Sequence, residues 1–287
     1  MRILVTGHTG LLGTELLPVL QADHDVTGCS LPERDITDPE AVRHAVDEAR
    51  PDLVVHAAAY TAVDECERQP DLAWRVNALG TRNVAIAAHE CGARLAYIST
   101  DYVFDGTKGS PYMEFDETRP LGVYGRSKWA GEQFVRYLGP PYYIIRSAWL
   151  FGAGGACFPD TILRLLREKG TVDVVTDQIG NPTWSRDLAE AVGRIVTSGL
   201  YGTYHAVNEG PTSWFEFARE IAGQFGHDPA SVRPTTSDRF PRPAPRPPNS
   251  SLRNFVLEET LGFRMRHWKE TLPGYAESVR RSLEESA

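Results

Sequence analysis

Short apolar runs alternate with longer, helix-like segments along the first half of the chain. The apolar runs predict strands at residues 2–6, 25–29, 53–59, 94–100 and 142–150. The stretch 53–59 is apolar almost throughout, which is typical of a parallel strand covered by helices on both faces. Residues 1–150 are therefore expected to form one doubly wound α/β unit around a parallel sheet.

Helix-start and helix-stop residues mark the segments between these strands. Asp38 is placed as an N-cap with Pro39 at the first helical position, and Gly92 is placed to end a long helix over residues 70–90. A helix is expected to begin near Leu11, where Pro18 should bend or shorten it. Another helix is expected around residues 124–137.

Beyond Gly152 the alternation is looser and loops take a larger share. Helices are expected near 159–168, 186–197 and 213–225, and strands at 172–176 and 203–207. We therefore expect a smaller C-terminal α/β lobe over residues 151–287, with the chain returning in part to the first unit after residue 180. The Pro-rich segment 239–248 is either an extended linker or a loop that contacts a ligand.

Composition narrows the possible partners and the compartment. The formal net charge of -8 argues against non-specific binding to nucleic acid or to an anionic membrane. The four cysteines include no C-x-x-C pair, so free buried thiols are expected rather than a zinc site or a disulfide framework. No apolar run approaches the roughly 20 residues that span a bilayer, and no cleavable signal precedes the first strand. A cytoplasmic location is expected.

A glycine-rich loop follows the first strand directly. Gly7, Gly10 and Gly13 have the spacing G-x-x-G-x-x-G at the start of the first helix. Such a loop lets backbone amides approach a pyrophosphate, whose charge the helix N-terminus favours. We therefore expect residues 1–150 to be a Rossmann-type dinucleotide-binding domain. The second strand ends without the usual acidic residue, which allows NADP, and Arg34 either binds its 2′-phosphate or is a solvated surface residue.

A Tyr-x-x-x-Lys pair gives the chain candidate catalytic groups. A helix would place Tyr124 and Lys128 on one face, one turn apart, and Thr100 ends a predicted strand upstream. A phenol exchanges protons poorly at neutral pH unless a cation stabilises its phenolate. Lys128 could supply that cation, Tyr124 the proton and Thr100 a hydrogen bond to a ketone oxygen. This arrangement predicts carbonyl reduction by hydride from a nicotinamide.

The motifs together resemble the extended short-chain dehydrogenases. The matching positions are the loop 7–13, the alanines 57–59, Asn77, the stretch Ser-Thr-Asp-Tyr-Val-Phe at 99–104, and Tyr124 with Lys128. Within that superfamily the chain is similar, over nearly its whole length, to the dTDP-4-dehydrorhamnose reductase family. The most specific matches are 99–104 and the Arg-Pro-x-Asn-Ser segment at 246–250, and further ones lie at 61–64, Trp149, 177–178, Gly180, Pro182 and Thr183.

The resemblance implies reduction of the 4-keto group of dTDP-6-deoxy-L-lyxo-4-hexulose to dTDP-L-rhamnose, with NADPH or NADH as hydride donor. It implies catalytic roles for Thr100, Tyr124 and Lys128. The implied cofactor-binding residues are Gly7, Thr9, Gly10, Leu11, Leu12, Gly13, Asp35, Ile36, Ala57, Ala58, Ala59, Tyr124 and Lys128. The implied substrate-binding residues are Val63, Thr100, Asp101, Tyr102, Trp149 and Arg246.

Some of these implications have alternatives. Trp149 is either a ligand contact or a core aromatic that caps a strand. Arg246 would bind the diphosphate, which favours the ligand-loop interpretation of the Pro-rich segment. Some members of the family bind magnesium through glutamates at a dimer interface. Glu15 matches one of these positions, but Arg186 stands where another glutamate is expected, so we predict no metal and leave a homodimer open.

Two other functions compete with reduction. A sugar-nucleotide epimerase or dehydratase would use a recycled NAD, but Tyr102 stands where a dehydratase would carry a glutamate after Asp101. A non-catalytic, cofactor-binding regulatory subunit is the second alternative, and the presence of Thr100, Tyr124 and Lys128 argues against it. The exact sugar, the nucleotide base and the choice between NADPH and NADH depend on pocket shape.

Overall fold

Six parallel strands form the central sheet of the protein. The computed structural model describes residues 1–30, 34–138, 141–153 and 155–285. The sheet order is β10-β5-β4-β3-β1-β2, so the direction of winding reverses between β1 and β3. The strands are β1 (Arg2–Thr6), β2 (Asp25–Cys29), β3 (Leu53–His56), β4 (Arg94–Thr100), β5 (Tyr142–Ser147) and β10 (Gly202–His205).

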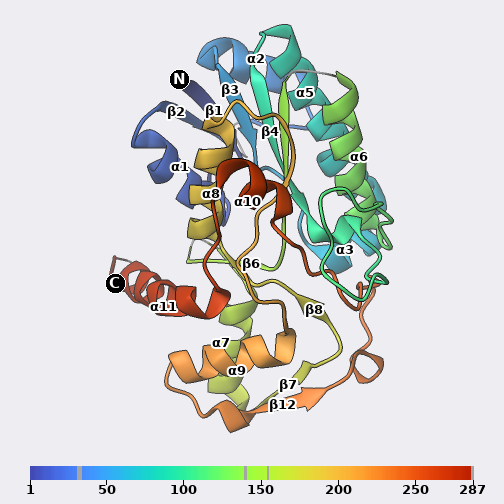
Figure 1. Cartoon of the computed structure of the whole chain (residues 1–287), viewed down its shortest axis with the longest axis vertical. Helices are drawn as coiled ribbons and strands as arrows, with labels where there is room; N and C mark the ends of the chain where they lie inside the picture. The colour runs from blue at the N-terminus through green and yellow to red at the C-terminus, as the bar shows by residue number, and fades with distance from the viewer. Residues whose placement is uncertain (31–33, 139–140, 154, 286–287) are drawn as a thin grey trace.

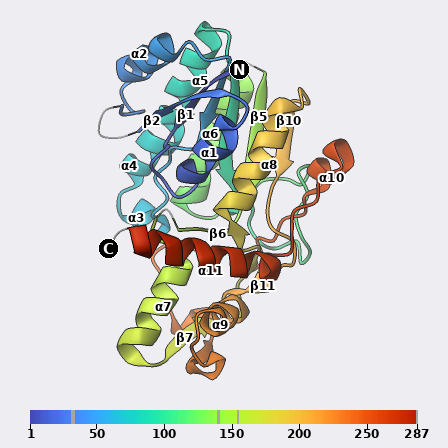
Figure 2. The ribbon, with the colours of Figure 1, turned by 90° about the vertical axis from the view of Figure 1, so that its left-hand side faces the viewer.

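Helices cover both faces of this sheet (Figures 1 and 2). One face packs against α1 (Gly13–Gln21) and α8 (Ser185–Thr197), and the other against α2 (Pro39–Ala49), α5 (Thr81–Glu90) and α6 (Val123–Leu138). Neighbouring residues of β1 point to opposite faces of the sheet, so each face needs its own layer of helices. Val5 packs with Leu16 of α1, whereas Leu4 packs with Val42 of α2. The predicted Rossmann-type doubly wound parallel sheet is confirmed.

Three predicted elements differ in detail from the observed ones. The strand predicted at 142–150 ends at Ser147, and a separate short strand, β6 (Leu150–Phe151), follows it. The strand predicted at 53–59 ends at His56, and the three alanines after it form a loop instead. The long helix predicted at 70–90 is divided into α4 (Pro70–Ala73), the π-helical η1 (Trp74–Gly80) and α5. Pro18 lies inside α1, which continues to Gln21. Asp38 caps α2 as expected, since its side chain accepts from the backbone N–H of Glu40 at 2.9 Å.

The smaller lobe lies at the carboxyl edge of the sheet, at the bottom of Figure 1. It contains α7 (Phe158–Lys169), β7 (Val172–Val175), α9 (Trp214–Gln224) and β12 (Val232–Thr235), and β7 pairs in parallel with β12. Ile162, Val174 and Ala218 belong to its small apolar core. A second, aromatic cluster joins Phe217 of α9 to Trp268 of α11 (Trp268–Glu285).

The C-terminal half contributes to both parts. Strand β10 and helix α8 belong to the large sheet layers, and α10 (Phe255–Leu261) adds Leu257 to the sheet's core. The sequence patterns gave no indication of β12, α10 or α11. Each is short, or mixes apolar and charged residues too evenly for a clear period, and depends on the surface that it covers.

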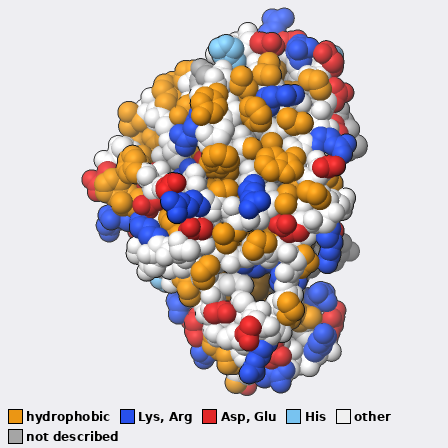
Figure 3. All heavy atoms as spheres, turned by 90° about the vertical axis from the view of Figure 1, so that its right-hand side faces the viewer, with side chains coloured by type: hydrophobic (Ala, Val, Ile, Leu, Met, Phe, Trp, Pro, Cys, Tyr) orange, Lys and Arg blue, Asp and Glu red, His pale blue; other side chains and the backbone are white. Residues whose placement is uncertain are grey.

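No helix in the described part of the chain is long and apolar enough to cross a membrane. Figure 3 shows apolar side chains gathered among charged ones on the face that carries α6, and the exposed aromatic residues Trp74 of η1 and Trp129 of α6 are among the large apolar groups left uncovered. All four cysteines are free, but Cys91 is exposed, so the expectation of buried thiols is wrong for that residue.

Candidate active site

A cavity of about 560 Å³ opens at the carboxyl ends of β1, β3, β4 and β5. This is the edge at which the winding reverses, where doubly wound folds bind ligands. Every residue predicted to bind the cofactor lines this one cavity: Gly7, Thr9, Gly10, Leu11, Leu12, Gly13, Asp35, Ile36, Ala57, Ala58, Ala59, Tyr124 and Lys128. The structure therefore brings together groups from four separate segments.

Close backbone packing explains the glycines of the first loop. Gly7 has φ +75°, and a β-carbon there would lie 2.6 Å from the backbone nitrogen of Ala58. A β-carbon at Gly13 would lie 2.2 Å from the carbonyl oxygen of Gly7. The N-cap residue of α1, Leu12, makes no side-chain capping bond, and Leu11, Leu12 and Gly13 line the cavity. The N–H groups of Thr14 and Glu15 already donate to the carbonyls of Gly10 and Leu12 at 3.0 and 3.1 Å. This arrangement suits a pyrophosphate.

The end of β2 contributes a polar wall. Ser30, Arg34 and Asp35 line the cavity, and residues 31–33 lie outside the described part of the chain. The guanidinium of Arg34 donates to Glu48 at 2.6 Å, so this arginine is both an ion-pair partner and part of the cavity wall. The Ser30 hydroxyl lies 3.0 Å from Nδ1 of His8 and accepts from the N–H of Thr9 at 3.3 Å.

The three predicted catalytic residues lie deep in the same cavity. Thr100 ends β4, while Tyr124 and Lys128 are one turn apart on α6. The Lys128 ammonium donates to the carbonyl of Ile98 at 2.6 Å and lies 4.3 Å from the centre of the Tyr97 ring. Burial lowers the pKa of Lys128 to about 7, and the carboxylate of Glu132 opposes this shift.

Tyr124 is held in its neutral form. Burial raises the pKa of its phenol, a hydrogen bond with Thr100 opposes that rise, and the nearby carboxyl of Asp101 adds to it. A neutral phenol is the form that can donate a proton to a developing alkoxide. The arrangement is therefore suited to carbonyl reduction.

A buried carboxyl fixes the Thr100 hydroxyl. Thr100 donates to one oxygen of Asp101 at 3.0 Å, and the hydroxyl of Ser250 donates to the other at 2.5 Å. Burial raises the pKa of Asp101 to about 7 in spite of these hydrogen bonds. Thr100 also accepts from the N–H of Tyr102, which lies in η2 (Asp101–Val103), at 3.2 Å. This second hydrogen bond further orients the Thr100 hydroxyl at the end of β4.

A buried ion pair joins α6, the helix that carries Tyr124 and Lys128, to strand β5. Glu132 of α6 accepts from Nε and Nη2 of Arg146 at 2.9 and 2.8 Å, and from the hydroxyl of Ser99 at 2.6 Å. Both charged side chains are almost completely buried, and although burial opposes it, Arg146 lowers the pKa of Glu132. The sequence motifs did not indicate this pair. The only sequence features that correspond to it are an arginine inside an apolar strand and an acidic residue one turn after Lys128.

A second cavity, of about 550 Å³, adjoins the first. The two share a wall that includes Thr100, Asp101, Tyr124 and Trp149. The remaining predicted substrate residues, Val63, Tyr102 and Arg246, line the second cavity. The lobe adds residues that the sequence analysis did not identify: Cys157, Phe158, Thr161 and Trp214.

Trp149 lies where the two cavities meet. Its backbone has φ +45°, a strained value for an aromatic residue, and its ring stacks on Trp214 at a centroid distance of 3.5 Å and an interplanar angle of 5°. The ring is half-buried and lines both cavities, which favours ligand contact over a purely structural role in the core. Gly180 allows the close approach, since a β-carbon there would lie 2.3 Å from the indole.

The predicted position of a magnesium ligand does not suit a cation. The Arg186 guanidinium lies 3.8 Å from Glu15 and 3.8 Å from Glu190, so it already supplies positive charge between these carboxylates. Burial raises the pKa of Glu15, which Arg186 opposes. Within the described residues no group of three His, Cys, Asp or Glu side chains is arranged to hold a metal.

Comparison with known proteins assigns the chain to a family. The sequence model of the RmlD substrate binding domain matches residues 1–281. The chain belongs to this family. It is 46% identical over 278 residues to the dTDP-4-dehydrorhamnose reductase of Streptomyces griseus, which covers 94% of this chain and 91% of the relative.

Solved structures of the RmlD family agree with this assignment. A dTDP-4-dehydrorhamnose reductase from Clostridium acetobutylicum superimposes with a TM-score of 0.94 at 44% identity, covering 98% of this chain and 100% of that one. The Bacillus anthracis enzyme of the same name, in complex with NADP, gives a TM-score of 0.93 at 40% identity, covering 96% and 98%. The family resemblance drawn from 99–104 and 246–250 is thus confirmed.

Proposed function

We propose that this member of the RmlD family reduces the 4-keto group of a dTDP-4-keto-6-deoxy sugar with NADPH or NADH, converting dTDP-4-dehydro-L-rhamnose to dTDP-L-rhamnose. One observation carries the proposal. Thr100 and Tyr124 line both the cavity of the glycine loop and the adjoining one of Arg246 and Trp149, and Lys128, one turn from Tyr124, lines the first. A ketone at this junction would lie against both a proton donor and a nicotinamide.

The residues divide the chemistry between them. The glycine loop and the alanines 57–59 would hold the dinucleotide, which when bound supplies a hydride to the carbonyl carbon. The Thr100 hydroxyl, once its hydrogen turns from Asp101, would donate to the carbonyl oxygen and orient it. Tyr124 donates its phenolic proton to that oxygen as negative charge develops on it. The ammonium of Lys128 stabilises the phenolate that remains. The product is the alcohol, with the hydride on carbon and the proton on oxygen.

The two parts of the fold would divide the ligands. We infer that residues 1–150 bind the dinucleotide and that the lobe within 151–287 binds the nucleotide sugar, because Phe158 and Trp214 from α7 and α9 complete the second cavity. Besides the dinucleotide, the partner that we propose for this site is the nucleotide sugar. A cytoplasmic location stays a prediction.

A homodimer is a further part of the proposal. The large apolar side chains Trp74, Leu79 and Trp129 are each more than a third exposed on η1 and α6, which pack against each other. Such a patch favours association with a second copy. Light scattering after gel filtration would give twice the mass of the chain if this is so, and a monomer would contradict it.

The test of the catalytic proposal is NADPH oxidation, followed by its near-ultraviolet absorbance, with enzymatically generated dTDP-6-deoxy-L-lyxo-4-hexulose. We expect turnover by the wild type and a loss of about 10²–10⁴-fold in Tyr124→Phe, with NADPH binding retained. Full activity of the variant would exclude Tyr124 as proton donor. No turnover by a wild type that binds NADPH would favour another 4-keto sugar or a regulatory role.

A further inference from the structure

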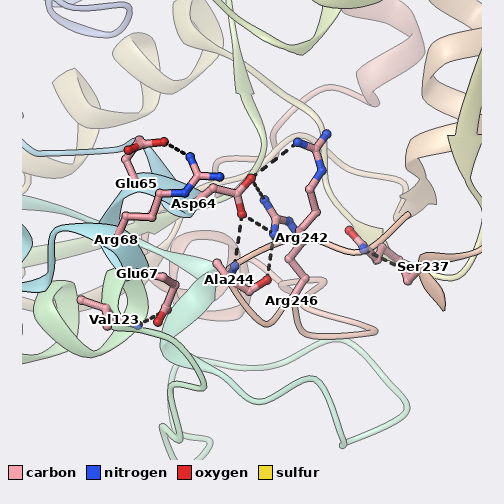
Figure 4. Close-up of polar contacts among 10 residues, drawn as sticks. Asp64, Glu65, Glu67, Arg68, Val123, Ser237, Arg242, Ala244 and Arg246 are labelled. Atoms are coloured by element: carbon pink, nitrogen blue, oxygen red, sulfur yellow. Dashed lines mark hydrogen bonds and ion pairs between the residues drawn. The ribbon is translucent and has the colours of Figure 1, made fainter. Parts of the chain in front are cut away.

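The guanidinium of Arg246 is held by a carboxylate from a distant part of the chain. Asp64, in α3 (Val63–Arg68), accepts from Nη1 and Nη2 of Arg246 at 2.9 and 3.0 Å (Figure 4). The same carboxylate accepts from the N–H of Ala244 at 3.2 Å, and Arg242 lies 3.6 Å from it. Both Asp64 and Arg246 are mostly buried, and Arg246 and Ala244 help to lower the pKa of Asp64 against the effect of burial.

The geometry leaves one edge of the Arg246 guanidinium free. A guanidinium has five N–H donors in one plane. Nη1 donates to Asp64 and to the carbonyl of Ala244 at 2.8 Å, and Nη2 gives one hydrogen to Asp64. The Nε hydrogen and the second Nη2 hydrogen lie side by side on the remaining edge, and no described residue accepts from them. Two parallel donors of this kind match two oxygens of a phosphate.

The position of Arg246 relates this edge to the reaction centre. Arg246 lines the second cavity, and its charge acts on the neighbouring phenol of Tyr102, whose pKa burial raises and Arg246 lowers. Tyr102 in turn packs edge-on against Tyr124 at a centroid distance of 5.7 Å. Arg246, Tyr102 and the proposed proton donor Tyr124 therefore line one cavity.

The segment after Arg246 is fixed at two further points. Pro247 and Pro248 pack so closely on Gly106 that a β-carbon there would lie 2.7 Å from Pro247. Ser250 then donates to Asp101. Asp64 is thus the first of three anchors that hold this segment along the wall of the cavity.

We propose that Asp64 is a positioning residue for substrate binding: it clamps the Arg246 guanidinium so that its free Nε/Nη2 edge binds the diphosphate of the nucleotide sugar. This inference rests on the proposed function. Asp64 faces two arginines, Arg246 and Arg242, so the cluster keeps positive charge for an anionic ligand. Without the clamp, the long side chain loses its fixed orientation, and ordering it again on binding costs affinity.

The experiment compares Asp64→Asn with a matched control, Glu65→Gln. Glu65 is the next residue of the same helix and pairs with Arg68, but that pair is exposed (Figure 4). At saturating NADPH we expect Asp64→Asn to raise the KM for the nucleotide sugar about tenfold, because an amide cannot accept both guanidinium hydrogens. The kcat and the KM for NADPH should stay close to wild type, and the control should change neither of these values nor the KM for the nucleotide sugar.

A double-mutant cycle shows whether Asp64 acts through Arg246. In an Arg246→Ala background, Asp64→Asn should add no further rise in KM. Arg246→Lys keeps the charge but not the paired donors, so it should raise KM as Asp64→Asn does. It also provides a test if Asp64→Asn does not fold. Calorimetric titration of the NADPH-bound protein with dTDP should show the same losses of affinity.

Three results would overturn the inference. A lower KM in Asp64→Asn would mean that Asp64 competes with the diphosphate for Arg246. Independent, multiplicative effects of the two substitutions would mean that Asp64 acts elsewhere. An unchanged dTDP affinity in Asp64→Asn or in Arg246→Lys would remove the clamp from substrate binding. A wild type that turns over no 4-keto sugar would instead refute the proposed function. The dTDP titrations would still test whether Asp64 contributes to binding of the diphosphate.

Discussion

Replacing Glu132 by glutamine tests how the catalytic helix is supported. The carboxylate of Glu132 has no exposed surface and accepts from Arg146 and Ser99, all at 2.9 Å or less. Glutamine keeps the shape of the side chain but leaves the guanidinium of Arg146 as a buried, unpaired cation. The other close groups around that cation are the Phe104 ring, 5.2 Å from its central carbon, and His205, whose pKa burial and Arg146 lower well below its usual range.

The size of the effect follows from burial. Removing one partner of a buried ion pair destabilises a protein by about 3–5 kcal/mol, because the other charge stays desolvated. For a chain of this size each kcal/mol lowers the thermal midpoint by about 2–4 °C, so Glu132→Gln should lower it by roughly 6–15 °C at pH 7. The difference in thermal midpoint between the wild type and Glu132→Gln should become smaller at acidic pH. Glu132 has a folded-state pKa below its ordinary value of 4.5, so its contribution is complete above that pH and is lost as the pH falls through the folded-state pKa.

Thermal unfolding followed by circular dichroism at pH 7 and at successively lower pH values below 4.5 would measure both effects. Asp173→Asn is the control, because the Asp173–Arg233 pair between β7 and β12 also has an Nε hydrogen bond, at 2.8 Å, but is half exposed. That control should change the free energy of unfolding by less than about 1 kcal/mol. A Glu132→Gln midpoint as close to wild type as that of the control would refute the reasoning, since the pair would then contribute nothing after desolvation.

Two further predictions concern the cofactor site and the pH dependence. Gly7→Ala should weaken NADPH binding at least about tenfold in a fluorescence titration, because its β-carbon would lie 2.6 Å from the backbone of Ala58 at φ +75°; unchanged affinity would contradict the assigned loop. The reduction rate should fall as the pH rises through about 7, because burial lowers the pKa of Lys128 to about 7 and the neutral amine cannot stabilise the Tyr124 phenolate. A profile of kcat/KM that stays flat to about pH 9 would exclude Lys128 as the required cation.

The sequence predicted the large sheet well because its signals are local. The apolar strands, the Asp38–Pro39 helix start and the glycine loop each depend on a few adjacent residues. The prediction was wrong at the end of β3, where the alanines 57–59 are apolar because a ligand cavity, rather than a helix, faces them. The π-helical η1 was also missed. Its side chains keep an ordinary helical pattern. Asn77 within it accepts from the N–H of Tyr60 and donates to the hydroxyl of Ser127, and such contacts between distant residues leave no local signal in the sequence.

The site was predictable as a set of positions but not as a set of contacts. The resemblance supplied the residues that line both cavities, since short motifs carry them. The contacts that orient these residues join positions far apart in the sequence: Asp64 with Arg246 across 182 residues, and Asp101 with Ser250 across 149. In the sequence, the carboxylates of such pairs cannot be told from ordinary surface acids. Their neighbouring residues do not show that an arginine or a hydroxyl from a distant part of the chain will lie beside them.

The same segment reaches both ends of the substrate site. Arg246 lies in the wall against which a diphosphate would bind, and four residues later Ser250 donates to the carboxyl group that also accepts from Thr100. A shift of this segment would therefore change the orientation of the Thr100 hydroxyl, which has no other side-chain acceptor among the described hydrogen bonds than Asp101. Binding of the diphosphate, far from the reacting carbonyl, would in this way act on the Thr100 hydroxyl, whose single hydrogen must leave Asp101 before it can reach a ketone oxygen.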